Sequence, residues 1–294
     1  MSLLPEELLK RVRQIEIITR KRVDDLMGGQ YRSNFKGTGV VFSEHRQYVA
    51  GDDVRHIDWK VSARTRDPVI KKFEEERELT VLLVVDGSAS KAFGTHAKLK
   101  SEVAAEIAGM LAYAASHAGD KVGVLIFDGK VGKIIPPKKG RSHILRIIRD
   151  LLTFESKSPG TDLKGALESA SRMLKHSGVV FILSDFFAEG YGIPLKRLAR
   201  KHDVVAMQIR DEREGDIPQI GQMILVDPES GQERFVDTDS YAFKKWFKEF
   251  SLEDETDLET SLKGGRVERL KIRTKEDYAE AVVRFFRARA RKRR

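Results

Sequence analysis

Four short apolar runs, separated by helical patterns, constrain the fold of this chain more than any other feature. The runs cover residues 80–85, 121–127, 179–183 and 203–209. They are rich in Val, Ile and Leu without polar alternation, which is typical of parallel strands buried on both faces. Strands that alternate with helices of ten or more residues imply right-handed crossovers within one sheet. We therefore predict an α/β fold with an open, mainly parallel sheet and helices on both faces.

The segments between and after these runs complete the expected element order. Asp128-Gly129 is a hairpin turn signal, which predicts an antiparallel edge strand near residues 132–135. A second hairpin is predicted over residues 223–236 and a closing strand over 267–272. Helical periodicity predicts helices near residues 97–118, 141–153, 162–176, 195–200 and 239–250, and another after Thr274.

The character of the chain changes at Leu79, and we divide it there. Residues 1–78 are predicted to form an N-terminal helix, over 5–26, and a polar, turn-rich extension. Residues 79–294 are predicted to form the α/β domain with its C-terminal helices and a basic tail. Because the extension has few apolar runs and many opposed charges, we expect it to depend on the sheet domain for its fold.

Two features of the extension suggest how it is held. Three arginines alternate with four aspartates, which predicts a charge-paired network tying the extension to the sheet domain; they are Arg46, Arg55 and Arg64 with Asp52, Asp53, Asp58 and Asp67. Trp59 is either a core anchor or a partner-facing residue. Its position between Ile57 and Val61 favours the core.

Composition excludes several classes of protein. The chain has no cysteine, which excludes disulfide frameworks, thiolate zinc sites and cysteine nucleophiles. The longest aliphatic run, residues 81–85, is far shorter than the roughly 20 residues that span a bilayer. Glu6 and Glu7 stand where a signal peptide would be basic. These observations predict a cytoplasmic protein.

The net charge of +9 is concentrated at the C-terminus. Residues 284–294 supply seven of these positive charges and contain no acidic residue. A tail of this kind could bind phosphates, but a basic helix end also interacts favourably with its own helix dipole and is usually solvated. The second interpretation is favoured, because the rest of the chain carries no basic stripe.

Oxygen-bearing side chains follow the predicted strands. Asp86, Ser88 and Ser90 come after the first strand, Asp185 follows the third, and Thr161 precedes a helix. Ligands of open parallel sheets collect at the carboxyl ends of the strands, so we expect these groups to converge. They are hard donors of the kind that Mg²⁺ or Mn²⁺ prefers. The alternative is that the serines cap the next segment and Asp185 ends a strand.

This order of residues resembles the metal-ion-dependent adhesion site (MIDAS) of von Willebrand factor A domains, which have a Rossmann-like fold. The family pattern is Asp-x-Ser-x-Ser, a distant Thr and a later Asp, and all five positions are met here. The resemblance implies that the hydroxyls bind Mg²⁺ directly and the aspartates largely through water. A carboxylate from a partner protein would complete the octahedron.

The segments 37–43, 46–59 and 62–65, which include Gly51-Asp52-Asp53-Val54-Arg55-His56-Ile57-Asp58-Trp59, resemble the signature of the domain of unknown function fifty-eight. The resemblance covers about residues 30 to 290. It implies association with a MoxR-type AAA+ ATPase in protein maturation or complex assembly. The chain departs from the family at Lys91, where relatives often have Met.

These observations predict a metal-dependent protein-interaction module rather than an enzyme. One alternative is a magnesium-dependent phosphohydrolase with Asp86 as nucleophile and Lys175 or Lys201 as the cation. The other is a nucleic-acid-associated factor that uses the Arg-rich tail. No phosphate-binding loop or nucleophile elbow is present. Because two facing carboxylates repel each other, Asp185→Ala is expected to keep or raise the melting temperature.

Overall fold

The computed structural model describes residues 10, 12–17, 41–74, 78–88, 99–214, 220–226 and 232–292. The chain divides into two compact units, one of residues 36–79 and one of residues 1–35 with 80–294. The predicted boundary after residue 78 therefore lies one residue from the division. The N-terminal helix, in contrast, groups with the sheet. Val12 and Ile15 are buried, and Glu16 binds Arg141 at 2.6 Å.

The larger unit is built on a six-stranded sheet with the strand order β10-β7-β6-β3-β4-β5. Its strands are β3 (Thr80–Asp86), β4 (Lys121–Phe127), β5 (Val131–Lys138), β6 (Val179–Ser184), β7 (Asp203–Arg210) and β10 (Glu268–Arg273). All neighbours pair in parallel except β5, which is antiparallel to β4. The predicted α/β fold and its antiparallel edge strand are confirmed.

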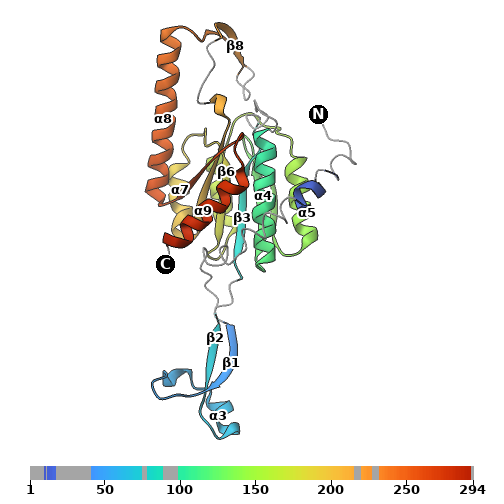
Figure 1. The fold of residues 1–294 in the computed structure, drawn as a ribbon, viewed down its shortest axis with the longest axis vertical. Helices are drawn as coiled ribbons and strands as arrows, with labels where there is room; N and C mark the ends of the chain where they lie inside the picture. The colour runs from blue at the N-terminus through green and yellow to red at the C-terminus, as the bar shows by residue number, and fades with distance from the viewer. Residues whose placement is uncertain are drawn as a thin grey trace. The chain divides into compact units, whose positions relative to one another are not determined.

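Helices cover both faces of this sheet (Figure 1). They are α4 (Lys100–His117), α5 (Arg141–Leu152), α6 (Leu163–Met173), α7 (Gly192–Lys201), α8 (Tyr241–Gly265) and α9 (Tyr278–Lys292). On one face α4 contacts α5 and α9, and on the other α7 lies between α6 and α8. Among the residues that the structure describes, no helix is long and apolar enough to cross a membrane.

Helix α8 runs 15 residues beyond the end near residue 250 that periodicity predicts. Its second half is held by tertiary contacts. Leu258 and Leu262 are buried in the core, and Glu255 accepts hydrogen bonds from Arg269 of β10. Because those partners lie far away in the sequence, the local pattern does not reveal them.

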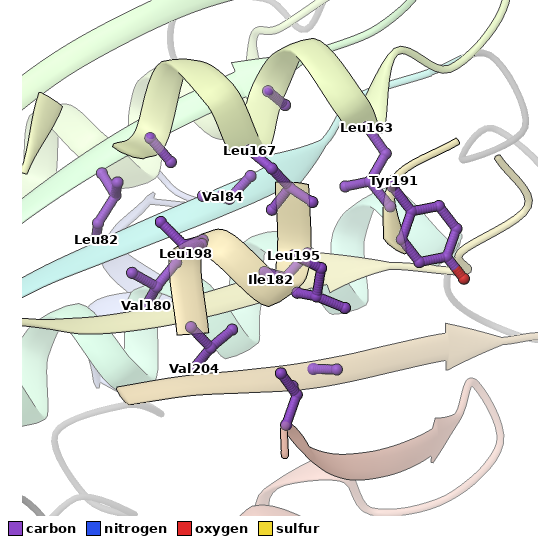
Figure 2. Packing of buried hydrophobic residues seen from close by; sticks show 14 of the residues in the cluster. Leu82, Val84, Leu163, Leu167, Val180, Ile182, Tyr191, Leu195, Leu198 and Val204 are labelled. Atoms are coloured by element: carbon purple, nitrogen blue, oxygen red, sulfur yellow. The ribbon is translucent and has the colours of Figure 1, made fainter. Parts of the chain in front are cut away.

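Apolar side chains of α6 and α7 face the sheet and form one of its two core layers (Figure 2). Leu167 and Leu195 from these helices pack with Val84 of β3 and Ile182 of β6. All four are fully buried. Burial of a side chain of this size contributes about 1.5–3 kcal/mol. This layer holds β3 and β6 rigidly, and both strands end at the predicted site.

A separate hairpin precedes α8. It consists of β8 (Gln222–Val226) and β9 (Glu233–Asp237), which pair antiparallel as predicted. In Figure 1, β8 and the amino-terminal part of α8 extend past the same end of the central sheet. Ile224, Val226 and Phe235 of this hairpin are exposed.

The smaller unit consists of the antiparallel pair β1 (Val41–Gln47) and β2 (Val69–Glu74) with η1 (Val54–His56) and α3 (Trp59–Thr65). Helix α3 was not predicted from the sequence. Asp58 caps it, accepting hydrogen bonds from the backbone N–H groups of Lys60 and Val61.

Two ion pairs of the smaller unit have both partners inside that unit. Arg46 forms a bidentate pair with Asp52, at 2.9 and 2.7 Å, and Arg55 binds Asp53 at 2.8 Å. The predicted pairing of arginine with aspartate is confirmed for both arginines, and a tie to the sheet domain stays a prediction. Trp59 is 69% exposed, so the expectation of a core anchor is wrong. It is the first residue of α3, and the two neighbours that suggested alternating burial do not lie on a strand with it.

Candidate functional site

The predicted site lies at the carboxyl ends of β3 and β6. These strands are neighbours, with Val85 paired to Leu183. Asp86 is the last residue of β3, and Asp185 directly follows β6. Both carboxylates are buried, with 2% and 1% exposure. Ser184 Oγ donates to Asp86 Oδ2 at 2.6 Å and links the two strand ends directly.

Ser88 lies on the turn that follows β3. Its backbone N–H donates to Asp86 Oδ1 at 3.0 Å, and the residue is 3% exposed. This Asx-type turn brings Ser88 back over the end of the strand. Ser90 and Lys91 lie outside the described residues, so the second serine of the predicted motif stays a prediction.

The turn after β6 has a strained backbone. Phe186 has φ of 65°, a left-handed conformation that favours glycine, and its N–H donates to Ser184 Oγ at 3.0 Å. The Phe186 ring is buried against Tyr191, with centroids 6.0 Å apart. Packing of this ring offsets the backbone cost, which is about 1–3 kcal/mol. Asp185 is thereby fixed by its neighbour in sequence.

Thr161 is held at the same edge by Asp128, which directly follows β4. The Asp128 carboxylate accepts hydrogen bonds from the N–H groups of Lys157, at 2.9 Å, and Ser158, at 3.1 Å. The Asp128 carbonyl accepts one from Asp162 N at 2.8 Å. Burial raises the pKa of Asp128, but these backbone hydrogen bonds outweigh it and hold the pKa below its usual value.

Asp128 was identified from sequence only as part of a turn, so its function as the anchor of the Thr161 loop was missed. Gly129 lets this loop pass, because a Cβ there would collide with the Pro159 carbonyl. A hairpin turn signal does not reveal a long-range anchor of this kind.

Lys100 is the residue of the site that sequence analysis missed entirely. It is the first residue of α4, and its side chain is fully buried. Its ammonium donates to Asp185 Oδ2 at 2.9 Å and also binds Glu214. Glu214 ends η3 (Glu212–Glu214), which follows β7. One ammonium therefore joins the ends of two neighbouring strands.

The chemistry of the donors fits a divalent cation. Asp86, Ser88, Thr161 and Asp185 supply hard oxygen atoms at one edge of the sheet. Within the described ranges, no three carboxylate or imidazole groups cluster as a metal site. A cation there would thus depend on the hydroxyls, as in the predicted motif. It would also have to share Asp185 with Lys100.

A cavity of about 340 Å³ borders the strand ends. Asp86 and Ser88 form one part of its lining, and the apolar side chains of Ile126, Leu151 and Phe154 form another. An apolar group can therefore lie next to the oxygen donors.

Arg210, at the end of β7, connects this site to α8. Its guanidinium lies 4.2 Å from the centre of the Phe187 ring, donates to the Asp185 carbonyl at 3.4 Å and binds Asp254 of α8. Burial raises the pKa of Asp254 above its usual value, although the Arg210 hydrogen bond opposes this.

An exposed aromatic face on the amino-terminal half of α8 was also missed. Phe243, Trp246, Phe247 and Phe250 form a contiguous set of rings, with the Trp246 and Phe250 centroids 5.7 Å apart. Trp246 is 52% exposed and Phe250 46%. Their spacing of three and four residues was the available signal. Exposed apolar clusters of this kind mark interaction sites.

The residues named for the alternative functions lie elsewhere. Lys175 precedes β6 and Lys201 precedes β7, so both lie at the amino edge of the sheet, away from Asp86. Lys100 and Arg210 are cations that do lie at the same edge as Asp86. In the basic tail, Arg289 is buried and binds Asp203 and Glu268, so this arginine is structural. Arg284, Arg287 and Arg291 are exposed.

The strand order and the helices on both faces define an α/β protein with an open, mainly parallel sheet. A family model described as "Protein of unknown function DUF58" matches residues 44–257. The chain therefore belongs to this family, as its upstream motif predicted.

The chain is also similar to other proteins and to solved structures. The proteins named Rv1480 of Mycobacterium tuberculosis and Mb1516 of Mycobacterium bovis are each 31% identical over 97% of this chain and 90% of their own length. Similar solved structures include BatB from Bacteroides thetaiotaomicron, with 14% identity, TM-score 0.48, and coverage of 72% of this chain and 99% of that one. They also include the SpRpn10 VWA domain, with 9% identity, TM-score 0.41, and coverage of 69% of this chain and 93% of that one.

Proposed function

We propose that this protein is a protein-interaction module that binds a partner through a divalent cation at the carboxyl ends of β3 and β6. The observation that carries the proposal is the junction of Asp86, Ser88 and Asp185 at the ends of two adjacent, fully buried strands. Open α/β sheets bind their ligands at the carboxyl ends of the strands, where these residues lie.

Different residues of the chain would provide the ligands and the charge that the cation needs. Ser88 and Thr161 would offer hydroxyl oxygens, and Asp86 and Asp185 would supply the negative charge that balances the cation. When bound, Mg²⁺ supplies an electrophilic centre to which a carboxylate from the partner can attach. The apolar part of the cavity next to Asp86 favours a partner whose acidic residue is flanked by an apolar side chain.

The exposed aromatic face of α8 would add contact area. Aromatic residues are enriched at the energetic centres of protein interfaces. Resemblance to the family makes a MoxR-type AAA+ ATPase, or a protein on which it acts, the partner we propose. The role is binding during protein maturation or complex assembly, without bond-breaking chemistry.

Calorimetric titration with Mg²⁺ and Mn²⁺ tests the metal site. Wild-type protein should show a single weak site, and Thr161→Val should abolish it while leaving the melting temperature within a few degrees of wild type. This substitution removes a hydroxyl without removing a charge. An isotherm that is unchanged in Thr161→Val and in Asp86→Asn would contradict the proposed ligand set.

A phosphohydrolase that uses Asp86 as nucleophile is the second candidate. Lys100 favours it, because a buried ammonium beside Asp185 places a positive charge at the edge where a phosphate would bind. Assays with a general phosphate ester decide between the two. Metal-dependent turnover that Asp86→Asn abolishes would support the enzyme, and absence of turnover in a metal-binding protein would support the interaction module.

A further inference from the structure

Lys100 occupies a position that is unfavourable for a lysine in two ways. Its ammonium is fully buried, and it lies at the amino end of α4, where the helix dipole already carries partial positive charge. Only its two carboxylate partners, Asp185 and Glu214, compensate for this in the described structure. The lysine is therefore held specifically by the strand-end site.

We propose that Lys100 is the resident cation of this site and competes with a divalent ion for Asp185. The inference rests on the proposed metal-binding function and concerns its regulation. An ion bound by Asp185 would lie within a few ångströms of the Lys100 ammonium. Two positive charges at such a short distance repel each other strongly in a buried site. The divalent ion and the Lys100 ammonium therefore cannot both bind Asp185 fully at the same time.

Glu214 provides a second carboxylate that can pair with the Lys100 ammonium when the ion displaces it from Asp185. It already binds Lys100, and its other oxygen, Oε2, accepts a hydrogen bond from Asp211 N at 3.1 Å. When the ion takes Asp185, Lys100 stays paired with Glu214 alone. Binding of the ion is thereby linked to η3, the segment after β7, where Arg210 connects to α8.

Competition from the Lys100 ammonium lowers the affinity of the site for the ion in the free protein. A partner that supplies its own carboxylate adds a ligand for the ion and shifts the balance away from Lys100. The ion and the partner would therefore bind cooperatively, each raising the affinity for the other.

The test measures Mn²⁺ affinity by calorimetry in the full chain. Lys100→Met removes the ammonium and keeps a buried side chain of similar length. Affinity for Mn²⁺ should rise at least about tenfold, because the repulsion is gone. Lys164→Met is the matched control, since Lys164 is an exposed lysine in the first turn of α6, next to the Thr161 loop. It should change the affinity by less than about threefold.

A second variant covers the case in which Lys100→Met does not fold. Lys100→Met/Glu214→Gln also removes one of the two carboxylates that would be left without the ammonium. Its melting temperature should rise more on addition of Mn²⁺ than that of wild type, because the ion replaces the missing charge beside Asp185.

The outcomes separate this inference from the proposed function. If both Lys100 variants bind Mn²⁺ no more tightly than wild type, Lys100 supports the site rather than competing for it, and this inference fails while the metal site stands. If neither wild type nor variants bind Mn²⁺, the metal-dependent function itself fails, and the inference fails with it.

Discussion

At the residue scale, the pair of Lys100 and Asp185 changes how substitutions at the site should behave. From sequence, two facing carboxylates suggested repulsion, so removal of Asp185 was expected to leave the melting temperature unchanged or raise it. In the structure Asp185 neutralises a buried ammonium. Removal of Asp185 is therefore expected to lower the melting temperature instead of keeping or raising it.

Asp185→Ala should lower the free energy of unfolding by about 1.5–3 kcal/mol, because it removes one of the two carboxylates that bind the buried Lys100 ammonium and leaves Glu214 as the other. Urea denaturation of wild type and variant in metal-free buffer measures this. The double variant Asp185→Ala/Lys100→Met should recover part of the loss. A melting temperature that is unchanged in Asp185→Ala would contradict the ion pair.

Asp128 should make stability depend on pH in the acidic range. Its pKa is below the ordinary value of 3.8 because backbone hydrogen bonds outweigh the effect of burial. A depressed carboxyl pKa contributes stability that is present above the unfolded value and lost as pH falls through the folded value. The stability difference between wild type and Asp128→Asn should therefore be constant above about pH 5 and shrink below pH 3.8.

This pH dependence can be measured from urea midpoints between pH 2.5 and 7. Asp162→Asn is a useful control, because Asp162 caps the neighbouring helix α6 rather than anchoring the loop. A difference between wild type and Asp128→Asn that stays constant down to pH 2.5 would show that the Asp128 hydrogen bonds are not formed.

At the element scale, sequence predicted the strands well and the ends of the helices less well. Apolar runs such as residues 80–85 give a clear signal, because strands buried on both faces need no polar alternation. Helix α8 was predicted too short, since its second half depends on contacts of Leu258, Leu262 and Glu255 with distant parts of the chain. Local periodicity cannot contain this information.

The same distinction applies to the candidate site. Asp86, Ser88 and Asp185 could be predicted because position after a strand is visible in sequence. Lys100 was missed although it shares a helix face with Val103 and Ile107, both buried. A lysine in an apolar stripe at a helix start was the available signal. Its partners, 85 and 114 residues away, were not visible.

The aromatic face of α8 should contribute to partner binding without supporting the fold. Trp246→Ala/Phe250→Ala should weaken binding to the cognate partner at least about tenfold, as expected for aromatic residues at an interface centre. Both rings are about half exposed, so the melting temperature should change little. Surface plasmon resonance and thermal unfolding of the same samples measure the two effects.

Tyr241→Ala is a matched control for that surface, because Tyr241 is 81% exposed and belongs to none of the ring pairs of the cluster. It should affect binding less than the double variant. Equal loss of binding and of stability in the double variant would indicate that the aromatic face supports the fold instead.

At the scale of the whole molecule, the division into two compact units predicts that they unfold independently, in contrast to the dependence expected from the sequence. Ion pairs of the smaller unit, such as Arg46 with Asp52, close within that unit. Deletion of residues 41–74 should therefore leave a protein that still melts cooperatively near the wild-type temperature. A chain that begins at Glu78 should melt lower, because it also lacks the buried Val12 and Ile15. Loss of cooperative melting on deletion of 41–74 would show that the units depend on each other.

At the same scale, the smaller unit presents an exposed tryptophan, Trp59. With 69% of its surface exposed at the start of α3, it has the character of a residue that contacts a partner. Sequence alternation favoured burial here because it assumed a strand where the chain forms a helix.

The most direct test of the account is capture of a cognate MoxR-type AAA+ ATPase by immobilised full-length protein, with Mg²⁺ or with EDTA. Wild type and Lys164→Met should retain the ATPase in Mg²⁺ and lose it in EDTA, whereas Thr161→Val should fail to retain it in either. Equal capture by all three proteins in both conditions would contradict metal-dependent binding at the ends of β3 and β6.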